Sequence, residues 1–157
     1  MAAGASGVAM TRKVVVGADH GGYYLKEEIK KFLKKERYDF EDIGNTRYDP
    51  EDDYVDYAEK VARKVAKRNS LGVLLCRSAA GMVIAANKIK GVRAVAAFGK
   101  KSAVHSREHN DANIIALSGT WLTTKKATEI LSAFLTAEFS REERHIRRLE
   151  KIRRLEQ

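Results

Sequence analysis

The chain has 157 residues, of which 44% are hydrophobic, which is enough to bury one core in a single domain of ordinary size. Its 30 Lys and Arg against 21 Asp and Glu give a net charge of +9, which favours phosphorylated metabolites, nucleic acid or an acidic membrane surface as partners, although a solvated basic surface would also explain it. A single cysteine excludes an internal disulfide and favours a reducing cytoplasm, and no apolar run approaches the roughly 18 residues that span a bilayer.

The first residues are set apart from the fold. The opening MAAGASGVAM lacks the basic and apolar regions of a secretory signal, and Met10 is a plausible true start. We therefore expect three parts: an N-terminal extension at 1–12 that is disordered or foreign to the native protein, an α/β domain at 13–140, and a C-terminal helix at 141–157.

Strands and helices alternate from residue 13 onward. The β-branched run KVVVG at 13–17 predicts a strand, and apolar residues at helical spacing over 23–36 predict a helix. A second strand is expected at 38–43, and the segment 46–53, which holds the only proline, is predicted to be a loop. Apolar residues on one face predict the next helix over 54–68.

The second half of the chain continues this alternation. The run at 71–75 is apolar without a period of two, which is typical of a strand buried on both faces of a parallel sheet. Two more strands are predicted at 92–97 and 113–117, and three more helices at 80–89, 100–109 and 125–139.

The C-terminal segment 141–157 is predicted to be a basic amphipathic helix. Its apolar stripe requires burial, either on its own subunit or across a dimer, and consists of Ile146, Leu149, Ile152 and Leu155. Arg144 and Arg148 lie one helical turn apart, a spacing that suits a phosphate clamp, with a solvated basic face as the alternative.

Five strands that alternate with helices predict the α/β class, with a doubly wound, five-stranded parallel sheet in a three-layer αβα sandwich. Ligands bind beyond the carboxyl ends of the strands in such sheets. We therefore expect the site among Asp19 and His20 after the first strand, Cys76 after the third, and the segments that follow strands four and five.

Cys76, the only cysteine, lies one residue past a buried strand and just before a helix. The free amides and positive end of that helix, together with Arg77, are expected to lower the pKa of its thiol. The amides of residues 78–81 form a plausible anion cradle. The alternatives are a cysteine that fills space and a helix start built from small residues for tight packing. Nucleotide hydrolysis and phosphatase chemistry are disfavoured, because GxxxxGK[ST] is absent and Met82 stands where a phosphatase has its arginine.

Two further pairs of polar residues are candidates. Asp19 beside His20 suits proton transfer or hydroxyl binding, with a capped turn as the alternative. His109 and Asn110, in REHNDAN, precede the fifth predicted strand, and we expect them on the same edge of the sheet as the other candidates. A capped helix end is the alternative for this second pair.

Five ordered motifs with matching intervals carry a specific resemblance. They are GADHGGYYLKEEIKKFL, DYVDYAEKVA, GVLLC-x4-GM-x-IAANKIKGVRA, REHNDANIIALSG and RHIRRLEKI. From 13 to about 152 the chain resembles the ribose-5-phosphate isomerase B family, which includes the galactose-6-phosphate isomerase subunits. The resemblance implies a flavodoxin- or Rossmann-like sandwich and a homodimer or tetramer whose active sites take residues from two subunits.

The resemblance also implies a reaction, the interconversion of an aldose phosphate and a ketose phosphate through an enediolate, with no metal and no cofactor. It makes Cys76 the base that moves a proton between C1 and C2, assigns ring opening to His109 with Asp19 nearby, and puts Ser78 close to the reacting hydroxyls. The positions that it implies for binding the substrate and its phosphate are His20, Tyr54, Arg77, Ala79, Ala80, Gly81, Asn110, Arg144 and Arg148. The expected partners are a sugar phosphate and a second copy of the chain, with neither nucleic acid nor membrane, in the cytoplasm.

The chain departs from the family pattern beside the cysteine. Where the family usually has CGTGxGM, Arg77 and Ala79 replace the first two glycines and only Gly81 remains. If either position requires a left-handed backbone, its Cβ costs about 1–2 kcal/mol. After the fourth strand, Phe98 and Gly99 stand where the family often has a polar histidine–aspartate pair.

These departures leave the substrate open. We expect an active isomerase with an altered sugar-phosphate preference, and the alternative is a homologue that binds a sugar phosphate with weak or no turnover. Nucleic-acid binding is suggested by the charge, but no recognition motif is evident and basic residues are interspersed with acidic ones. A different thiol chemistry is the remaining alternative.

Overall fold

The structure, a computed structural model, describes residues 12–156. The expected N-terminal extension, apart from Arg12, and the last residue, Gln157, lie outside the described residues. The strands are β1 (Val14–Ala18), β2 (Phe40–Asp42), β3 (Leu71–Cys76), β4 (Ala94–Ala96) and β5 (Ile114–Ser118). The helices are α1 (Tyr23–Lys35), α2 (Tyr54–Lys67), α3 (Ala80–Ala86), α4 (Lys100–Asn110), α5 (Thr124–Thr136) and α6 (Glu143–Arg154), and a 3-10 turn, η1 (His20–Gly22), precedes α1.

The five strands form one parallel sheet in the order β2-β1-β3-β5-β4. β1 and β3 are buried along their whole length, as their unbroken apolar sequences predict. The chain leaves β1 toward β2 on one side and later returns to β3 on the other, so the order of the strands reverses between β1 and β3. This is the point at which open α/β sheets bind their ligands.

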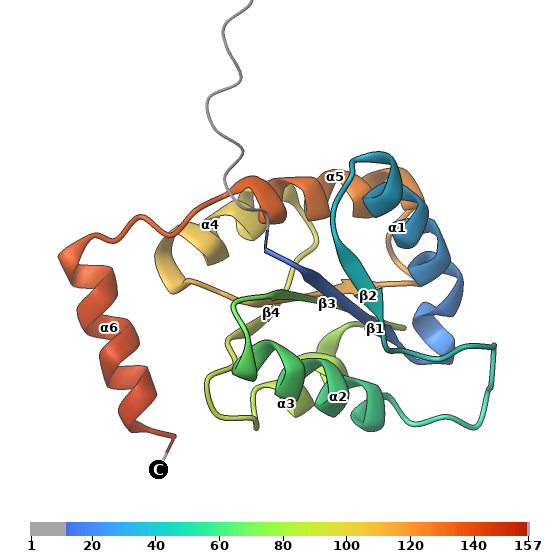
Figure 1. Ribbon diagram of the computed structural model, residues 1–157, viewed down its shortest axis with the longest axis horizontal. Helices are drawn as coiled ribbons and strands as arrows, with labels where there is room; N and C mark the ends of the chain where they lie inside the picture. The colour runs from blue at the N-terminus through green and yellow to red at the C-terminus, as the bar shows by residue number, and fades with distance from the viewer. Residues whose placement is uncertain (1–11, 157) are drawn as a thin grey trace, which may run out of the picture.

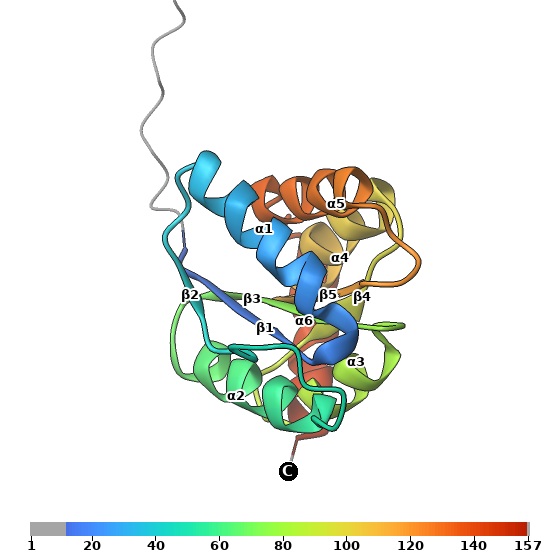
Figure 2. The same cartoon turned by 90° about the vertical axis from the view of Figure 1, so that its right-hand side faces the viewer.

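Helices cover both faces of the sheet. Figures 1 and 2 show α1, α4 and α5 on one face and α2 and α3 on the other. Each layer buries its own apolar cluster, with Ile29 and Phe134 in the first and Val61 and Met82 in the second. The predicted three-layer αβα sandwich is therefore confirmed.

The C-terminal helix α6 is separate from these layers. It projects from the end of the molecule that lies on the left of Figure 1 and contacts α4. Its predicted apolar stripe is only partly buried on its own subunit, because Leu149 is half-buried whereas Ile146, Ile152 and Leu155 are exposed. The described chain therefore leaves an apolar helix face uncovered.

The predicted boundaries hold best for β1, β3 and the long helices, and worst at the edges of the sheet. β2 and β4 are three residues long, where the sequence predicts six, because each pairs with only one neighbour. The third helix ends at Ala86 instead of 89, since the Asn87 side chain both donates to the carbonyl and accepts from the amide of Ala94. That pair of hydrogen bonds ends α3 and fastens it to β4.

Glycines allow the loops at the carboxyl edge of the sheet to touch. A Cβ at Gly22 would lie 2.2 Å from the carbonyl oxygen of Leu75, and one at Gly119 would lie 2.2 Å from that of Gly21. The Gly119 amide donates to the Cys76 carbonyl at 2.8 Å. The loops after β1, β3 and β5 therefore pack backbone against backbone, and this fixes the positions of the side chains they carry.

We predict that Gly22→Ala destabilises the protein by about 1–3 kcal/mol, because the added methyl group meets rigid backbone. Gly99→Ala is the matched control: nothing lies within 4 Å of its Cβ position and its backbone is extended, so its effect should stay within about 0.5 kcal/mol. Urea unfolding of both variants measures the difference, and equal stabilities would show that the two loops do not pack as described.

Candidate active site

The candidate site lies where β1 and β3 end side by side. Ala18 is paired with Leu75 in the parallel register, so Asp19 and His20 follow one strand next to Cys76 at the end of the other. The amide of Asp19 donates to the carbonyl of Leu75 at 3.3 Å. The sequence prediction that these three side chains meet at the carboxyl edge is confirmed.

Cys76 lies at the bottom of this site with 5% of its surface exposed. Its Sγ accepts a hydrogen bond from the Ala79 amide at 3.1 Å. Burial raises the pKa of the Cys76 thiol, and the amides of Ala79, Met82 and Ser78 oppose that rise only in part. The amides at the helix start therefore lower this pKa as expected, but burial outweighs them because β3 carries the sulfur into the apolar interior, so the expected net lowering is wrong for the described chain.

The two replaced glycines of the loop after Cys76 differ in conformation. Ala79 has a left-handed backbone, with φ of 71° and ψ of −22°, and its side chain is completely buried. Arg77 has no positive φ, and its side chain is exposed. The cost of a Cβ therefore falls on Ala79, at about 1–2 kcal/mol. The same backbone conformation directs its amide to the sulfur.

Tyr54 forms a wall beside this loop. It begins α2, and a Cβ at Gly81 would lie 2.6 Å from its ring. Ser78 is half-buried and Ala80 is exposed. The structure thus brings together residues 77–81 and Tyr54, as the sequence predicts.

Asp52, which the sequence did not single out, fixes His20. Its Oδ1 accepts the His20 backbone N–H at 3.0 Å and lies 2.7 Å from His20 Nδ1. This arrangement leaves Nε2 of His20 free for a ligand. The signal was hidden, because Asp52 stands in the acidic run DPEDD, where no spacing separates it from its neighbours.

Asp19 is a buried carboxyl group at the site. It is 6% exposed, and its Oδ1 has no hydrogen-bond partner among the described residues. Burial raises the pKa of Asp19, the positive charge of His20 opposes this, and the charge of Asp52 adds to it. Ligand atoms of Asp19, His20 and Asp52 lie within 4.8 Å of one another, so this group could hold a metal ion.

His109 and Asn110 do not lie at this site, contrary to the sequence expectation. α4 starts beyond the carboxyl end of β4 and runs back, so both residues at its end lie near the start of β5, at the amino edge of the sheet. An eleven-residue helix covers about 16 Å at 1.5 Å per residue. The sequence argument failed because it placed residues that precede a strand with those that follow one.

Arg144 and Arg148 lie at the amino edge as well. Both are exposed on α6, and the Nε of Arg144 donates to Glu142 at 2.9 Å.

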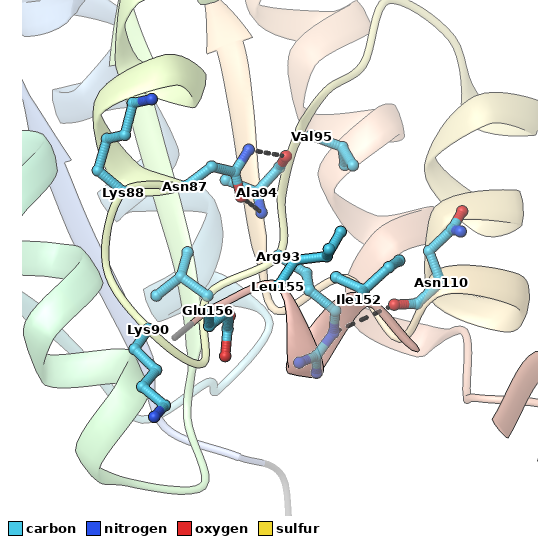
Figure 3. A pocket seen from close by; sticks show the side chains of 11 residues that line it. Asn87, Lys88, Lys90, Arg93, Ala94, Val95, Asn110, Ile152, Leu155 and Glu156 are labelled. Atoms are coloured by element: carbon cyan, nitrogen blue, oxygen red, sulfur yellow. Dashed lines mark hydrogen bonds between the residues drawn. The ribbon is translucent and has the colours of Figure 1, made fainter. Parts of the chain in front are cut away.

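A cleft of about 620 Å³ also lies at this end, between α6, the α3–β4 connection and the end of α4 (Figure 3). Asn110 lines it, and its carbonyl accepts from Arg93 at 3.2 Å. This cleft is therefore distinct from the place where Cys76 lies.

No helix in the described part of the chain is long and apolar enough to cross a membrane.

Comparison with known proteins places these observations in a family. The model of the Ribose/Galactose Isomerase family matches residues 14–152. Ribose-5-phosphate isomerase B of Mycobacterium tuberculosis is 41% identical over 139 residues, covering 88% of this chain and 86% of its own.

Solved structures agree with the sequence match. The crystal structure of ribose-5-phosphate isomerase B from Mycoplasma genitalium with bound ribulose-5-phosphate is 38% identical, with a TM-score of 0.89 over 94% of this chain and 97% of its own. The solved structure of Clostridium thermocellum ribose-5-phosphate isomerase B is 41% identical, with a TM-score of 0.88 over 92% of this chain and 97% of its own.

We predict that Asp19→Asn stabilises the protein at neutral pH, since it removes a buried charge whose ionisation the fold opposes. A raised pKa in the folded state lowers stability once the pH exceeds the ordinary value of 3.8, so the gain should vanish below that pH. Tm should rise by about 2–4 °C for each kcal/mol recovered. Asp52→Asn is the control: it breaks the contact with His20 and should not raise Tm. An unchanged or lower Tm for Asp19→Asn would contradict the unpaired charge.

Proposed function

The chain belongs to the ribose/galactose isomerase family, and we propose that it interconverts an aldose phosphate and a ketose phosphate, ribose 5-phosphate and ribulose 5-phosphate or a related pair, with Cys76 as the base. The observation that carries this proposal is the position of Cys76. Its sulfur accepts a hydrogen bond from the Ala79 amide at the strand switch point, beside Asp19, His20 and Tyr54.

The proposed chemistry is a proton transfer. Cys76 takes the proton from C2 of the open-chain aldose, the C–H electron pair forms the C1–C2 double bond, and negative charge develops on the oxygen of C1. The proton of the C2 hydroxyl passes to the oxygen of C1, and return of the carbon-derived proton from Cys76 to C1 then leaves the carbonyl at C2, which gives the ketose. Amides of the loop at 78–81 are suitable donors to such an oxygen. Since an ordinary thiol is only a few per cent ionised at neutral pH and burial raises this one further, the amides on Sγ have a necessary role.

The proposed assembly is a dimer with shared sites. One chain separates Cys76 from His109, Arg144 and Arg148 by the length of the sheet. The uncovered apolar face of α6 supports docking on a second copy. A two-fold dimer could then bring His109 and both arginines of one subunit to Cys76 of the other, so that a guanidinium pair holds the phosphate while the sulfur meets the reacting carbons.

Arg77 supports an altered substrate preference. Its exposed guanidinium forms no hydrogen bond or ion pair within residues 12–156, although its backbone touches the loop after β1. Phe98 and Trp121, 5.9 Å apart between ring centroids, are exposed beyond β4 and β5. A free cation and an aromatic pair therefore border the site, where they can select among sugars of different length.

A binding homologue is the second candidate function, favoured by the raised thiol pKa and by the strain at Ala79. Turnover should be measured with ribose 5-phosphate, allose 6-phosphate, galactose 6-phosphate and a four-carbon aldose phosphate. We expect activity on at least one, altered in preference by Arg77→Gly. Thermal stabilisation by these compounds without any turnover would establish the binding homologue instead.

We predict that Cys76→Ala lowers kcat by roughly 10²–10⁴-fold, the usual contribution of a positioned base, with the fold intact. An unchanged rate would remove the sulfur from the mechanism. Loss of activity by unfolding is recognised from the circular dichroism spectrum and from the sedimentation coefficient.

Shared sites predict complementation. Cys76→Ala and His109→Ala, each inactive alone, should regain roughly a quarter of the wild-type activity when refolded together, because half of the dimers are mixed and each has one intact site of two. Cys76→Ala mixed with Asp19→Ala is the control, since both changes lie on the same side of a site and no site is restored. Absence of recovery in the first mixture, with mixed dimers demonstrated, would contradict the shared site.

A further inference from the structure

Three imidazoles are stacked where α4 meets α6. His105 and His109 lie one turn apart on α4, with ring centroids separated by 3.9 Å and planes tilted by 36°. His145 of α6 stacks on His109 at 4.3 Å, with a tilt of 30°. His109 is thus the central ring, in contact with a neighbour from its own helix and with one from the C-terminal helix.

His145 is the fixed member of this stack. Only 2% of its surface is exposed, and its Nδ1 lies 2.8 Å from Ser140 Oγ. Its backbone amide donates to the Glu142 carbonyl, and the amide of Ser140 donates to the carbonyl of Glu108 on α4. The segment before α6 is therefore tied to α4, and the ring of His145 is held from two directions.

The surroundings favour a neutral ring at His145. Burial lowers its pKa, and the positive charges of His109, Arg144 and Arg148 act in the same direction, whereas Glu142 opposes them. Its Nε2 has no hydrogen-bond partner among the residues that the structure describes. His145 therefore presents the flat face of its ring to His109.

We propose that His145 and His105 are positioning residues, which hold the imidazole of His109 in one plane so that only its edge can reach a sugar. This proposal rests on the proposed function, in which His109 completes a partner's site. Proton exchange with a ring oxygen requires a nitrogen within about 2.6–3.2 Å, a condition that a freely rotating side chain at a helix end meets only part of the time. Contact of His109 with both neighbours limits it to the rotamer that keeps the stack.

His105 gives the cleaner of the two tests, because it lies on α4 and is exposed. Its removal leaves α6 and both arginines in place, whereas His145→Ala could release the helix. His105→Ala should lower kcat for ribose 5-phosphate by about tenfold, and His105→Phe, which keeps a ring there, should stay within about twofold of wild type. Lys101→Ala, an exposed change on the same helix, serves as the control. Equal rates for the Ala and Phe variants would overturn the proposal.

A comparison of two substrates separates positioning from a general structural effect. A four-carbon aldose phosphate carries its phosphate on O4 and cannot close a furanose ring, so it needs no ring opening. If wild type accepts it, His105→Ala should slow ribose 5-phosphate and leave this compound unaffected; equal loss on both would overturn the proposal. If wild type accepts only ribose 5-phosphate, the comparison between the Ala and Phe variants decides.

Failure of the proposed function would be recognised separately, as a folded wild-type protein that turns over no sugar phosphate. In that case the positioning proposal is still decided by NMR. Ring currents of two stacked imidazoles displace the His109 ring C–H resonances, and His105→Ala should return them toward the values of an unstructured peptide. Random-coil shifts for His109 in wild type, or no change in the variant, would overturn the proposed stack.

Discussion

The direction of the parallel strands is the constraint on which the rest of the molecule depends. All carboxyl ends meet at one edge of the sheet, so Cys76, Asp19 and His20 come together without further help. The same polarity carries anything at the end of a following helix to the opposite edge, as it does His109. β3 spans roughly 20 Å at about 3.3 Å per residue, a distance no side chain bridges. A site that needs both groups has to be built from two chains.

The loop after Cys76 shows what the local chemistry costs. Burying the sulfur raises its pKa, and the amide of Ala79 is one of the few groups close enough to oppose this. That amide points to the sulfur because the backbone at Ala79 is left-handed, a conformation that glycine adopts without strain and alanine does not. Arg77, the other departure from the family pattern, has no such conflict, so its side chain is free to serve another purpose at the surface.

Sequence patterns predicted the parts of the structure that depend on the order along the chain. The alternation of strands and helices predicts the parallel sheet. The sheet in turn predicts that Asp19 lies close to Cys76, because residues that directly follow parallel strands share one edge of the sheet. Residues that precede a strand obey the opposite rule, which is why His109 was misplaced. Asp52 and the contacts of His145 depend on how a loop and a terminal helix fold back in space. Asp52 stands in a run of acidic residues and His145 stands among arginines, and neither stretch has a periodic pattern from which these contacts could be predicted.

Helix α6 couples the positions of Arg144 and Arg148 to the position of His145, which contacts α4. Arg144 and Arg148 share one face, while His145 lies about 100° around the helix from Arg144 and turns inward to α4. A displacement of α6 therefore moves Arg144, Arg148 and the ring that stacks on His109 together. Because the apolar face of this helix is exposed in a single chain, its final position depends on whatever covers that face. In the proposed dimer, the subunit that covers the apolar face of α6 is also the one that contributes Cys76 to the shared site. Association of the two subunits would therefore set phosphate binding and the orientation of the His109 ring in the same step.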